Sequence, residues 1–385
     1  MRVVIAPDSF KGSCDSPAAA AAIAAGWRRG APGWETVCLP VADGGEGTLH
    51  ALVGSLGGRI VQHTVTGPHG QPVSAELGLI PAEQPGGRVT GVVEMASASG
   101  LHLVDPTPTS AAAATSYGTG ELIKAALDAG AERILLTLGG SATTDGGVGM
   151  AQALGVRFAT ASGAENASGG VGLHDIVAVD LAGVHPGLAR CEVIAACDVD
   201  SPLHGPRGAA YVFGPQKGAD EATVRMLDDG LRRLGEVCGA LADPAAPGAG
   251  AAGGLGFASL AFLGAELRSG FDLVADAVGL ASAIAGADLV ITGEGRLDTQ
   301  SLGGKTPVGV MRLAQEHGVP VVVIAGDVSQ GADAAIAAGM TAVFSAAPGP
   351  GPLHEALDRV ENDLSRTAES IARVWAAAGG QGRRL

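Results

Sequence analysis

Aromatic and basic side chains are both scarce in this sequence. Phe, Trp and Tyr make up 3% of the residues, and 24 Lys and Arg stand against 39 Asp and Glu, giving a formal net charge of −15. Proteins that bind nucleic acid need a basic surface against the phosphates, and many stack bases on aromatic rings. The composition therefore excludes nucleic acid as a partner. It also makes each Lys or Arg that lies among glycines informative.

Cysteines and long apolar runs are also few. The five cysteines form no Cys-x-x-Cys pair, and their odd number argues against a disulfide framework and against a cysteine-rich zinc site. No apolar run approaches the ~18 residues that cross a membrane, and the apolar run after Met1 is too short for a signal peptide. We therefore expect a cytoplasmic protein with no membrane partner.

Glycine and aliphatic residues are abundant, with 62 glycines and 46% hydrophobic residues in a chain of 385. At roughly 100–200 residues per domain, this length favours two domains. Short β-branched runs alternate with Ala-rich helical stretches near both ends, whereas strands joined without helices occupy part of the middle. The patterns predict an α/β fold: a discontinuous Rossmann-like parallel domain, 1–65 plus 285–385, and an inserted mixed α/β domain, 66–284. Ligands would bind in the cleft between them.

Local signals predict the bounds of several elements. Pro17–Arg29 is predicted as a helix with Ser16 as its N-cap, because proline is favoured in the first helical turn. Further predictions are strands at Arg2–Ala6, Ala209–Phe213 and Asp288–Thr292, a loop at 243–256, and one terminal helix from about Leu353 to Ala377.

Four predicted strands end in loops that combine glycines with acidic residues, and each loop precedes a predicted helix. The loops are Ala6–Ser13, Pro40–Thr48, Gly139–Gly147 and Thr292–Asp298, the last continuing to Gly303–Thr306. Glycines let the backbone approach a phosphate, and helix N-termini attract anions. Carboxylates in the same loops would repel phosphate unless they hold Mg²⁺ or accept a substrate proton. One such loop alone would be an ordinary turn with an Asp cap, but four together indicate phosphoryl transfer with a metal.

A fifth strand end carries Asp198 and Asp200. Asp198 directly follows an apolar run and is the better placed of the two to face a cleft, whereas Asp200 is typical of a turn. A turn is the alternative for Asp198 as well. Further along the chain, Arg207 and Lys217 are cations among glycines, and we interpret both as partners for an anion.

Two nucleotide-binding patterns are incomplete. Thr299–Thr306 ends like a P-loop but has Thr299 in place of the first glycine, so only Lys305 is retained as a phosphate-binding candidate. Gly248–Gly253 matches Gly-x-Gly-x-x-Gly but follows prolines rather than a strand, which argues against a dinucleotide site. Neither a histidine pair with zinc-ligand spacing nor a Gly-x-Ser-x-Gly elbow is present.

The ordered motifs of the chain resemble those of one known family, the bacterial glycerate kinases of the first type. The resemblance extends over nearly the full length of the chain. It rests on APDSFKGS at Ala6–Ser13, PVADGGEGT at Pro40–Thr48, EMASASGL at Glu94–Leu101, ATSYGTGELI at Ala114–Ile123, ACDVD at Ala196–Asp200, FGPQKGA at Phe213–Ala219 and LVITGEGRLD at Leu289–Asp298. Cys14, Thr144 and Ser201 depart from the usual family pattern, which bears on substrate tuning more than on reaction class.

The resemblance implies D-glycerate and ATP as substrates, Mg²⁺ as cofactor, a two-domain fold, and 2-phosphoglycerate in preference to 3-phosphoglycerate as product. The residue roles follow from the chemistry of the loops. Asp198 is the predicted general base, and Lys11 and Asp8 complete the catalytic set. Glu294 and Asp298 are the predicted metal ligands. Substrate and phosphate contacts are predicted for Ser9, Asp43, Gly44, Gly45, Glu46, Gly139, Gly140, Ser141, Asp145, Arg207, Lys217, Arg296 and Lys305.

Two other functions remain open from the residues alone. A nicotinamide-dependent hydroxy-acid dehydrogenase would need the Gly248–Gly253 segment to bind a dinucleotide. A non-catalytic module that binds sugar acids would need fewer acidic loops than this chain carries. The sequence does not specify an oligomeric state.

Overall fold

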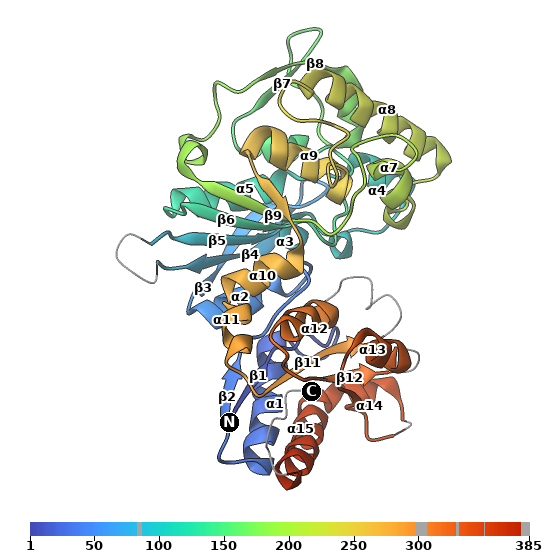
Figure 1. The fold of residues 1–385 in the computed structure, drawn as a ribbon. Coiled ribbons are helices and arrows are strands. Elements are labelled where there is room, and N and C mark those ends of the chain that lie inside the picture. The colour runs from blue at the N-terminus through green and yellow to red at the C-terminus, as the bar shows by residue number, and fades with distance from the viewer. Residues whose placement is uncertain (83–86, 298–305, 329–330, 350, 379–385) are drawn as a thin grey trace. The chain divides into compact units, whose positions relative to one another are not determined.

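The computed structural model describes residues 1–82, 87–297, 306–328, 331–349 and 351–378 (Figure 1). The chain divides into two compact units. Unit 1 comprises Met1–Asp43, His50–Leu56 and Phe271–Leu385, and unit 2 comprises Gly44–Leu49 and Gly57–Gly270. Three segments fall on the other side of this division from the predicted domain boundaries, namely residues 44–49, 57–65 and 271–284.

Unit 1 is built on a parallel five-stranded sheet in the order β13-β12-β11-β1-β2. Its strands are β1 Arg2–Ile5, β2 Glu35–Cys38, β11 Leu289–Arg296, β12 Val321–Asp327 and β13 Ala342–Ser345. Strands β1 and β12 and the first residues of β11 are apolar runs, because helices cover both faces of a parallel sheet. Strand β1 pairs with β11, so the prediction that the two ends of the chain share one sheet is confirmed.

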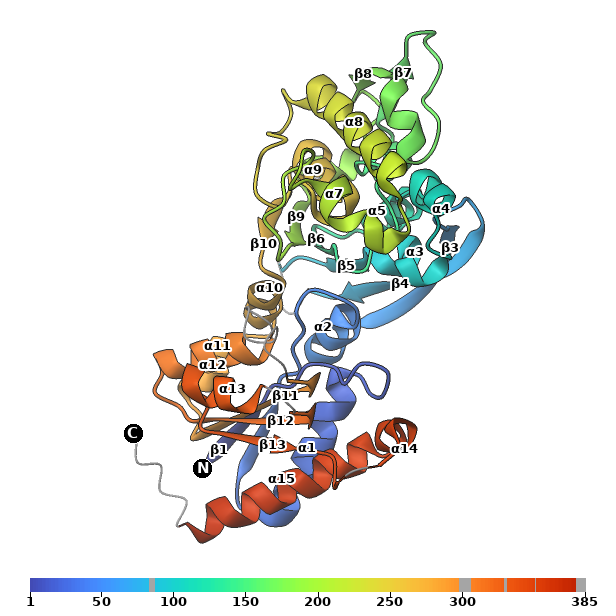
Figure 2. The same cartoon turned by 90° about the vertical axis from the view of Figure 1, so that its right-hand side faces the viewer.

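Helices from the two ends of the chain pack together in unit 1. Its helices are α1 Ser16–Gly30, α11 Leu280–Ala285, α12 Thr306–Glu316, α13 Ala332–Ala338, α14 Leu353–Asp358 and α15 Val360–Ala377, while α2 Thr48–Leu56 and α10 Gly270–Ala277 begin in unit 2 and continue into unit 1. Figures 1 and 2 both show α1 beside α15. The approach is so close that a Cβ on Gly26 would collide with the carbonyl group of Ser365.

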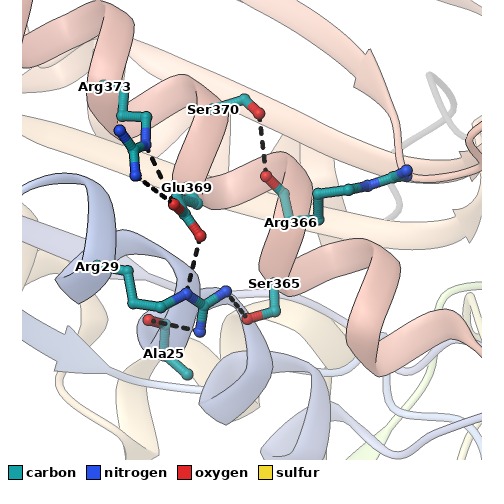
Figure 3. Close-up of polar contacts among 7 residues, drawn as sticks. All are labelled: Ala25, Arg29, Ser365, Arg366, Glu369, Ser370 and Arg373. Atoms are coloured by element: carbon teal, nitrogen blue, oxygen red, sulfur yellow. Dashed lines mark hydrogen bonds and ion pairs between the residues drawn. The ribbon is translucent and has the colours of Figure 1, made fainter.

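A polar cluster borders the contact between α1 and α15 (Figure 3). The Arg29 guanidinium donates to Glu369 at 2.8 Å and to the Ser365 hydroxyl at 3.0 Å, and Arg373 donates to the other Glu369 oxygen at 2.7 Å. Because the arginines are largely exposed, the cluster fixes orientation more than it adds stability. At the other end of α1 the N-cap is Asp15, which accepts from Ala18 N at 2.8 Å, so the predicted Ser16 cap is wrong by one residue.

Unit 2 is built on a mixed six-stranded sheet in the order β10-β9-β6-β5-β4-β3. The strands are β3 Arg59–Thr66, β4 Pro72–Ile80, β5 Thr90–Glu94, β6 Arg133–Thr137, β9 Glu192–Ala196 and β10 Glu266–Arg268. Strand β4 is antiparallel to β3 and β5, and the pairs from β5 to β10 are parallel. The parallel strands therefore end at one edge of the sheet, where ligands of α/β folds bind.

Helices and a small hairpin complete unit 2. The helices are α3 Met95–Ser99, α4 Pro108–Ala113, α5 Tyr117–Asp128, α6 Val148–Ala153, α7 Ala209–Phe213, α8 Glu221–Cys238 and α9 Ala251–Leu263, and the hairpin pairs β7 Arg157–Thr160 with β8 Ile176–Asp180. Short 3₁₀ turns occupy Leu101–Leu103, Gly170–Asp175, Pro186–Arg190 and Pro215–Lys217. One extensive apolar core joins the sheet to α5, α6, α8 and α9. Within the described residues, no helix is long and apolar enough to cross a membrane.

Four predicted elements differ from the structure. Ala209–Phe213 is the helix α7 rather than a strand, because a five-residue apolar run does not distinguish the two by periodicity. The predicted loop at 243–256 is shorter than predicted, because α9 already begins at Ala251. The first turn of α9 contains left-handed backbone at 252–254. The terminal helix is divided into α14 and α15 at Arg359. Strand β11 runs on to Arg296, four residues beyond its predicted end at Thr292.

Candidate active site

In unit 1, three strand-end segments meet around Asp8. The Asp8 amide donates to Gly293 O of β11 at 2.8 Å, and Val41 N, after β2, donates to Pro7 O at 3.0 Å. These bonds extend the sheet pairing past the strand ends and hold the three backbones together. The predicted site residues Asp8 and Asp43 follow the ends of adjacent strands in the sheet.

Asp8 is buried, with 9% of its surface exposed. One carboxylate oxygen accepts from Ser9 N at 2.6 Å, and the other accepts from the Thr306 hydroxyl at 2.6 Å. Burial, together with the nearby Asp43 carboxylate, raises the pKa of Asp8 to about 6, against the opposing effects of Thr306, Ser9 and Lys11. A carboxyl group that titrates so close to neutrality at a strand end is typical of functional sites.

Thr306 was missed by the sequence analysis as a site residue. It is buried at the start of α12 and lies 298 residues away from Asp8 in the sequence. A threonine at a helix start predicts a cap on its own helix, and nothing in the local pattern indicates a distant carboxylate partner. The Ser9 hydroxyl, a predicted substrate contact, is buried and has no hydrogen-bond partner within the described residues.

The remaining charged site candidates of unit 1 that the structure describes lie on the strand β11 and in the loop after β1. Glu294 is buried on β11 rather than in a loop, opposite Ala325 of β12. Arg296 pairs with Asp327 across the same strands, with Arg296 Nε 3.3 Å from the carboxylate, and Lys11 is exposed. The predicted ligands Asp298 and Lys305 lie outside the described residues.

In unit 2, the Gly44–Gly45 turn packs against the start of α10, the end of β9 and the loop after β6. Gly44 has φ +81°, and a Cβ there would lie 2.7 Å from Gly270 Cα and 2.9 Å from Ala196 Cβ. A Cβ on Gly139 would lie 3.1 Å from Gly45 Cα. Both the backbone conformation and the close approach therefore require glycine at position 44. Glu46 is exposed in the same turn.

Asp198 lies at the edge of the sheet that the Gly44–Gly45 turn covers. Its carboxylate accepts from the Gly270 amide at 3.0 Å, at the start of α10, and its side chain is exposed. This contact fits the turn interpretation, but it does not exclude a base, because a carboxylate has further acceptor positions. Arg207 is exposed in the segment before α7.

Asp145 is buried beneath its loop, with 1% of its surface exposed. It accepts from the amide and the hydroxyl of Ser116, both at 2.8 Å, and from the amides of Gly147 at 3.0 Å and Gly149 at 3.3 Å. Burial raises its pKa, while these hydrogen bonds act in the opposite direction. This geometry places Asp145 within the protein scaffold rather than on a surface that a substrate reaches.

Lys217 is also buried, with 1% of its surface exposed. Its Nζ donates to the Ser141 hydroxyl at 2.9 Å and to Thr143 O at 2.6 Å. Burial lowers the pKa of Lys217 to about 7, and the Asp145 carboxylate partly offsets that effect. The ammonium group thus contacts the loop after β6 from within the protein.

The acidic residues of unit 1 bear on the predicted magnesium ion. The described residues contain no group of three or more His, Cys, Asp or Glu side chains that could hold a metal ion by themselves. Mg²⁺ in kinases needs only one or two carboxylates, because substrate phosphates and water complete its coordination. Asp43 and Glu294 can supply those carboxylates, and with Asp8 they concentrate negative charge at the strand ends of one sheet.

Known proteins match the chain along nearly its whole length. The profile of the glycerate kinase family matches residues 3–376. A glycerate kinase of Bacillus subtilis is 46% identical over 375 residues, 97% of each chain, and a glycerate 2-kinase of Escherichia coli is 44% identical over 379 residues, 98% of each chain. A Salmonella typhimurium crystal structure described as a glycerate kinase 2 superposes with a TM-score of 0.88 at 43% identity, covering 99% of this chain and 100% of the other.

Proposed function

This chain belongs to the glycerate kinase family and is a phosphotransferase, and from that premise we propose that it transfers the γ-phosphoryl group of ATP to D-glycerate with Mg²⁺. The match of family and fold over the whole chain is the observation that carries the proposal. We further propose 2-phosphoglycerate as the product, since one full-length relative is named a glycerate 2-kinase.

Chemically, the substrate hydroxyl oxygen attacks the γ-phosphorus, the bond to the β,γ-bridging oxygen breaks, and ADP leaves. The hydroxyl proton passes to a carboxylate, for which we propose Asp198. Phosphoryl transfer depends mainly on charge neutralisation and alignment, so metal-binding carboxylates and loop amides contribute more than the base. We propose Asp43 and Glu294 for the metal, and Lys11 with the glycine-rich loops for the anionic groups.

The other two functions have less support. No curated relative named here is a dehydrogenase or a binding module. The Gly248–Gly253 segment leads into α9 and follows the region after α8 rather than a strand, so it does not form the strand–turn–helix that a dinucleotide requires.

Phosphorus NMR of one reaction tests the proposal. The protein is incubated with D-glycerate, ATP and Mg²⁺, and the phosphoglycerate isomer is identified, with L-glycerate and EDTA as controls. We expect 2-phosphoglycerate and ADP from D-glycerate but not from L-glycerate. We expect no turnover when EDTA removes the divalent metal. Formation of 3-phosphoglycerate would overturn the regiochemistry, and turnover in EDTA would overturn the role of the metal.

A further inference from the structure

Lys217 is an unusual residue for the interior of a protein. Lysine is almost never fully buried, and removing an ammonium group from water is costly unless it is paired and hydrogen-bonded. Lys217 lies in the 3₁₀ turn after α7, and 1% of its surface is exposed. The next residue, Gly218, has φ +95°, and a Cβ there would collide with the backbone at Pro106 and Thr107. The backbone beside Lys217 therefore packs closely against the segment at Pro106 and Thr107.

The ammonium group holds one half of the loop that follows β6. Nζ bonds the Ser141 hydroxyl at 2.9 Å and the Thr143 carbonyl at 2.6 Å, two points on the inner side of that loop. Asp145 holds the other half through the amides of Gly147 and Gly149. Two buried groups of opposite charge thus fasten the loop from within, one on each side of Thr144.

The other side of the loop presents backbone to solvent. Gly139 is partly exposed and Gly140 is exposed, the latter with φ +76°. Within the described part of the chain, neither glycine amide donates a hydrogen bond, whereas the Gly140 carbonyl accepts from Leu101 N at 2.8 Å and Ala142 N donates to Ser99 O at 2.9 Å. Amides left available beside a left-handed glycine are suited to binding an anion.

We propose that Lys217 is a positioning residue: it fixes the Gly139–Thr143 loop from within, so that the loop amides face an anionic substrate group, and it does not touch that group itself. The inference rests on the proposed phosphoryl transfer, which supplies the anion. It also replaces the direct anion contact that the sequence analysis assigned to Lys217, because both described hydrogen bonds of its ammonium group are made to the loop.

The test compares Lys217→Met with Lys124→Met. Methionine fills a similar volume without donating hydrogen bonds, and Lys124 is an exposed lysine of α5 in the same unit, paired with Asp128. We expect Lys217→Met to lower kcat/KM about 10–100-fold at temperatures well below its Tm, because a misplaced loop is costly in phosphoryl transfer. The Ala142 amide, which donates to Ser99 O, and the Leu101 amide, which donates to Gly140 O, should exchange hydrogen on the order of tenfold faster. Lys124→Met should change neither quantity.

Ser141→Ala completes a double-mutant cycle. If Lys217 acts through the loop, the double variant is no worse than Lys217→Met alone, because the two changes break one linkage. Additive effects on KM together with unchanged hydrogen exchange would overturn the proposal in favour of direct anion contact. Unchanged kcat/KM and exchange with only a lowered Tm would overturn it in favour of a purely structural lysine. If Lys217→Met does not fold, Ser141→Ala and Lys217→Gln are judged by the same two readouts.

Hydrogen exchange separates this inference from the proposed function. It reports on the loop whether or not glycerate is the acceptor. If the parent protein phosphorylates another compound, the kinetic comparison is made with that compound.

Discussion

Some groups around Asp8 raise its pKa and others lower it, so small changes among them should shift the pH dependence of activity. Burial and the Asp43 carboxylate raise its pKa to about 6, against the hydrogen bonds from Thr306 and Ser9 and the charge of Lys11. A carboxyl group whose pKa is higher in the folded than in the unfolded state stabilises the fold at low pH. This stabilisation is lost as the pH rises through the folded-state pKa. The fold therefore tolerates an ionised Asp8 at neutral pH at some cost in stability, which is a common feature of functional sites.

Thr306→Val tests whether ionised Asp8 is needed. The valine removes the hydroxyl that donates to Asp8, so the pKa of Asp8 rises further. We expect the acid limb of the kcat/KM profile, which falls as pH drops through about 6, to move to higher pH, while activity at pH above ~8 is largely retained. Thr306→Ser keeps the hydroxyl and should leave the limb in place. A limb unmoved by Thr306→Val would show that Asp8 does not control it.

Asp198→Asn separates the two interpretations of Asp198. Asparagine keeps an oxygen that can accept from the Gly270 amide, so Tm should not change. If Asp198 is the base, kcat falls about 100-fold with a modest change in the glycerate KM, at the low end of the range for general bases. Asp200→Asn, two residues along in an exposed position, should be silent. Kinetics of Asp198→Asn within twofold of the parent would identify Asp198 as a turn residue only.

The chemistry of individual residues could be predicted from the sequence better than their surroundings. Acids beside glycines at strand ends drew attention to Asp8, and a cation among glycines drew attention to Lys217. Burial of Lys217 could not be predicted, because the groups it bonds belong to a loop more than 70 residues earlier in the chain. The partnership of Asp8 with Thr306 was likewise hidden by sequence distance.

At the scale of elements, α1 and α15 depend on glycine where they meet. Gly26 has no room for a side chain against Ser365 of α15, and a Cβ on Gly30 would lie 2.6 Å from the Ala372 Cβ. Both helices flank the sheet of unit 1 and contribute to one apolar core. The stability of unit 1 is therefore sensitive to methyl-sized changes at these positions.

Gly26→Ala should destabilise unit 1. Alanine favours a helix by ~1 kcal/mol, but a clash with a backbone carbonyl forces the helices apart, and overpacking of this kind costs about 1–3 kcal/mol or more. The carbonyl of Ser365 belongs to the backbone and cannot rotate away as a side chain could. We therefore expect the clash to cost more than the helix propensity of alanine contributes, so that Tm falls. Gly33→Ala has open space around it and should change the free energy of unfolding by less than about 0.5 kcal/mol. Equal Tm values for the two variants in thermal unfolding would contradict this close packing.

Elements with strong local signals were predicted, and short apolar ones were not. Strand β1 and helix α1 lie close to their predicted positions, because a β-branched run and a helix start with proline are visible in the sequence. Helix α8 was missed, although Asp220 caps it and its faces are distinct. Helix α7 was mistaken for a strand because its side chains are apolar all round.

For the whole molecule, the composition of unit 2, whose two segments are separated in the chain only by His50–Leu56, predicts independent folding. Residues 44–270 contain its complete six-stranded sheet and its extensive core, whereas the sheet of unit 1 requires strands from both ends of the chain. A fragment of residues 44–270 should unfold cooperatively, as followed by circular dichroism. A fragment of residues 271–385 lacks β1 and β2 and should show no cooperative transition. A 44–270 fragment without a cooperative transition would contradict the division. The expectation that ligands bind between the two domains remains a prediction.

The pairing of β1 with β11 has a consequence for the newborn chain on the ribosome. Strands β1 and β2 emerge well before their neighbour β11, which is synthesised only after the whole of unit 2. At roughly 5–20 residues per second, this delay lasts on the order of ten seconds or more. Throughout it, β1 exposes an unpaired edge and α1 exposes the apolar face that α15 will cover. We expect this N-terminal segment to be the part of the chain that chaperones shield during translation.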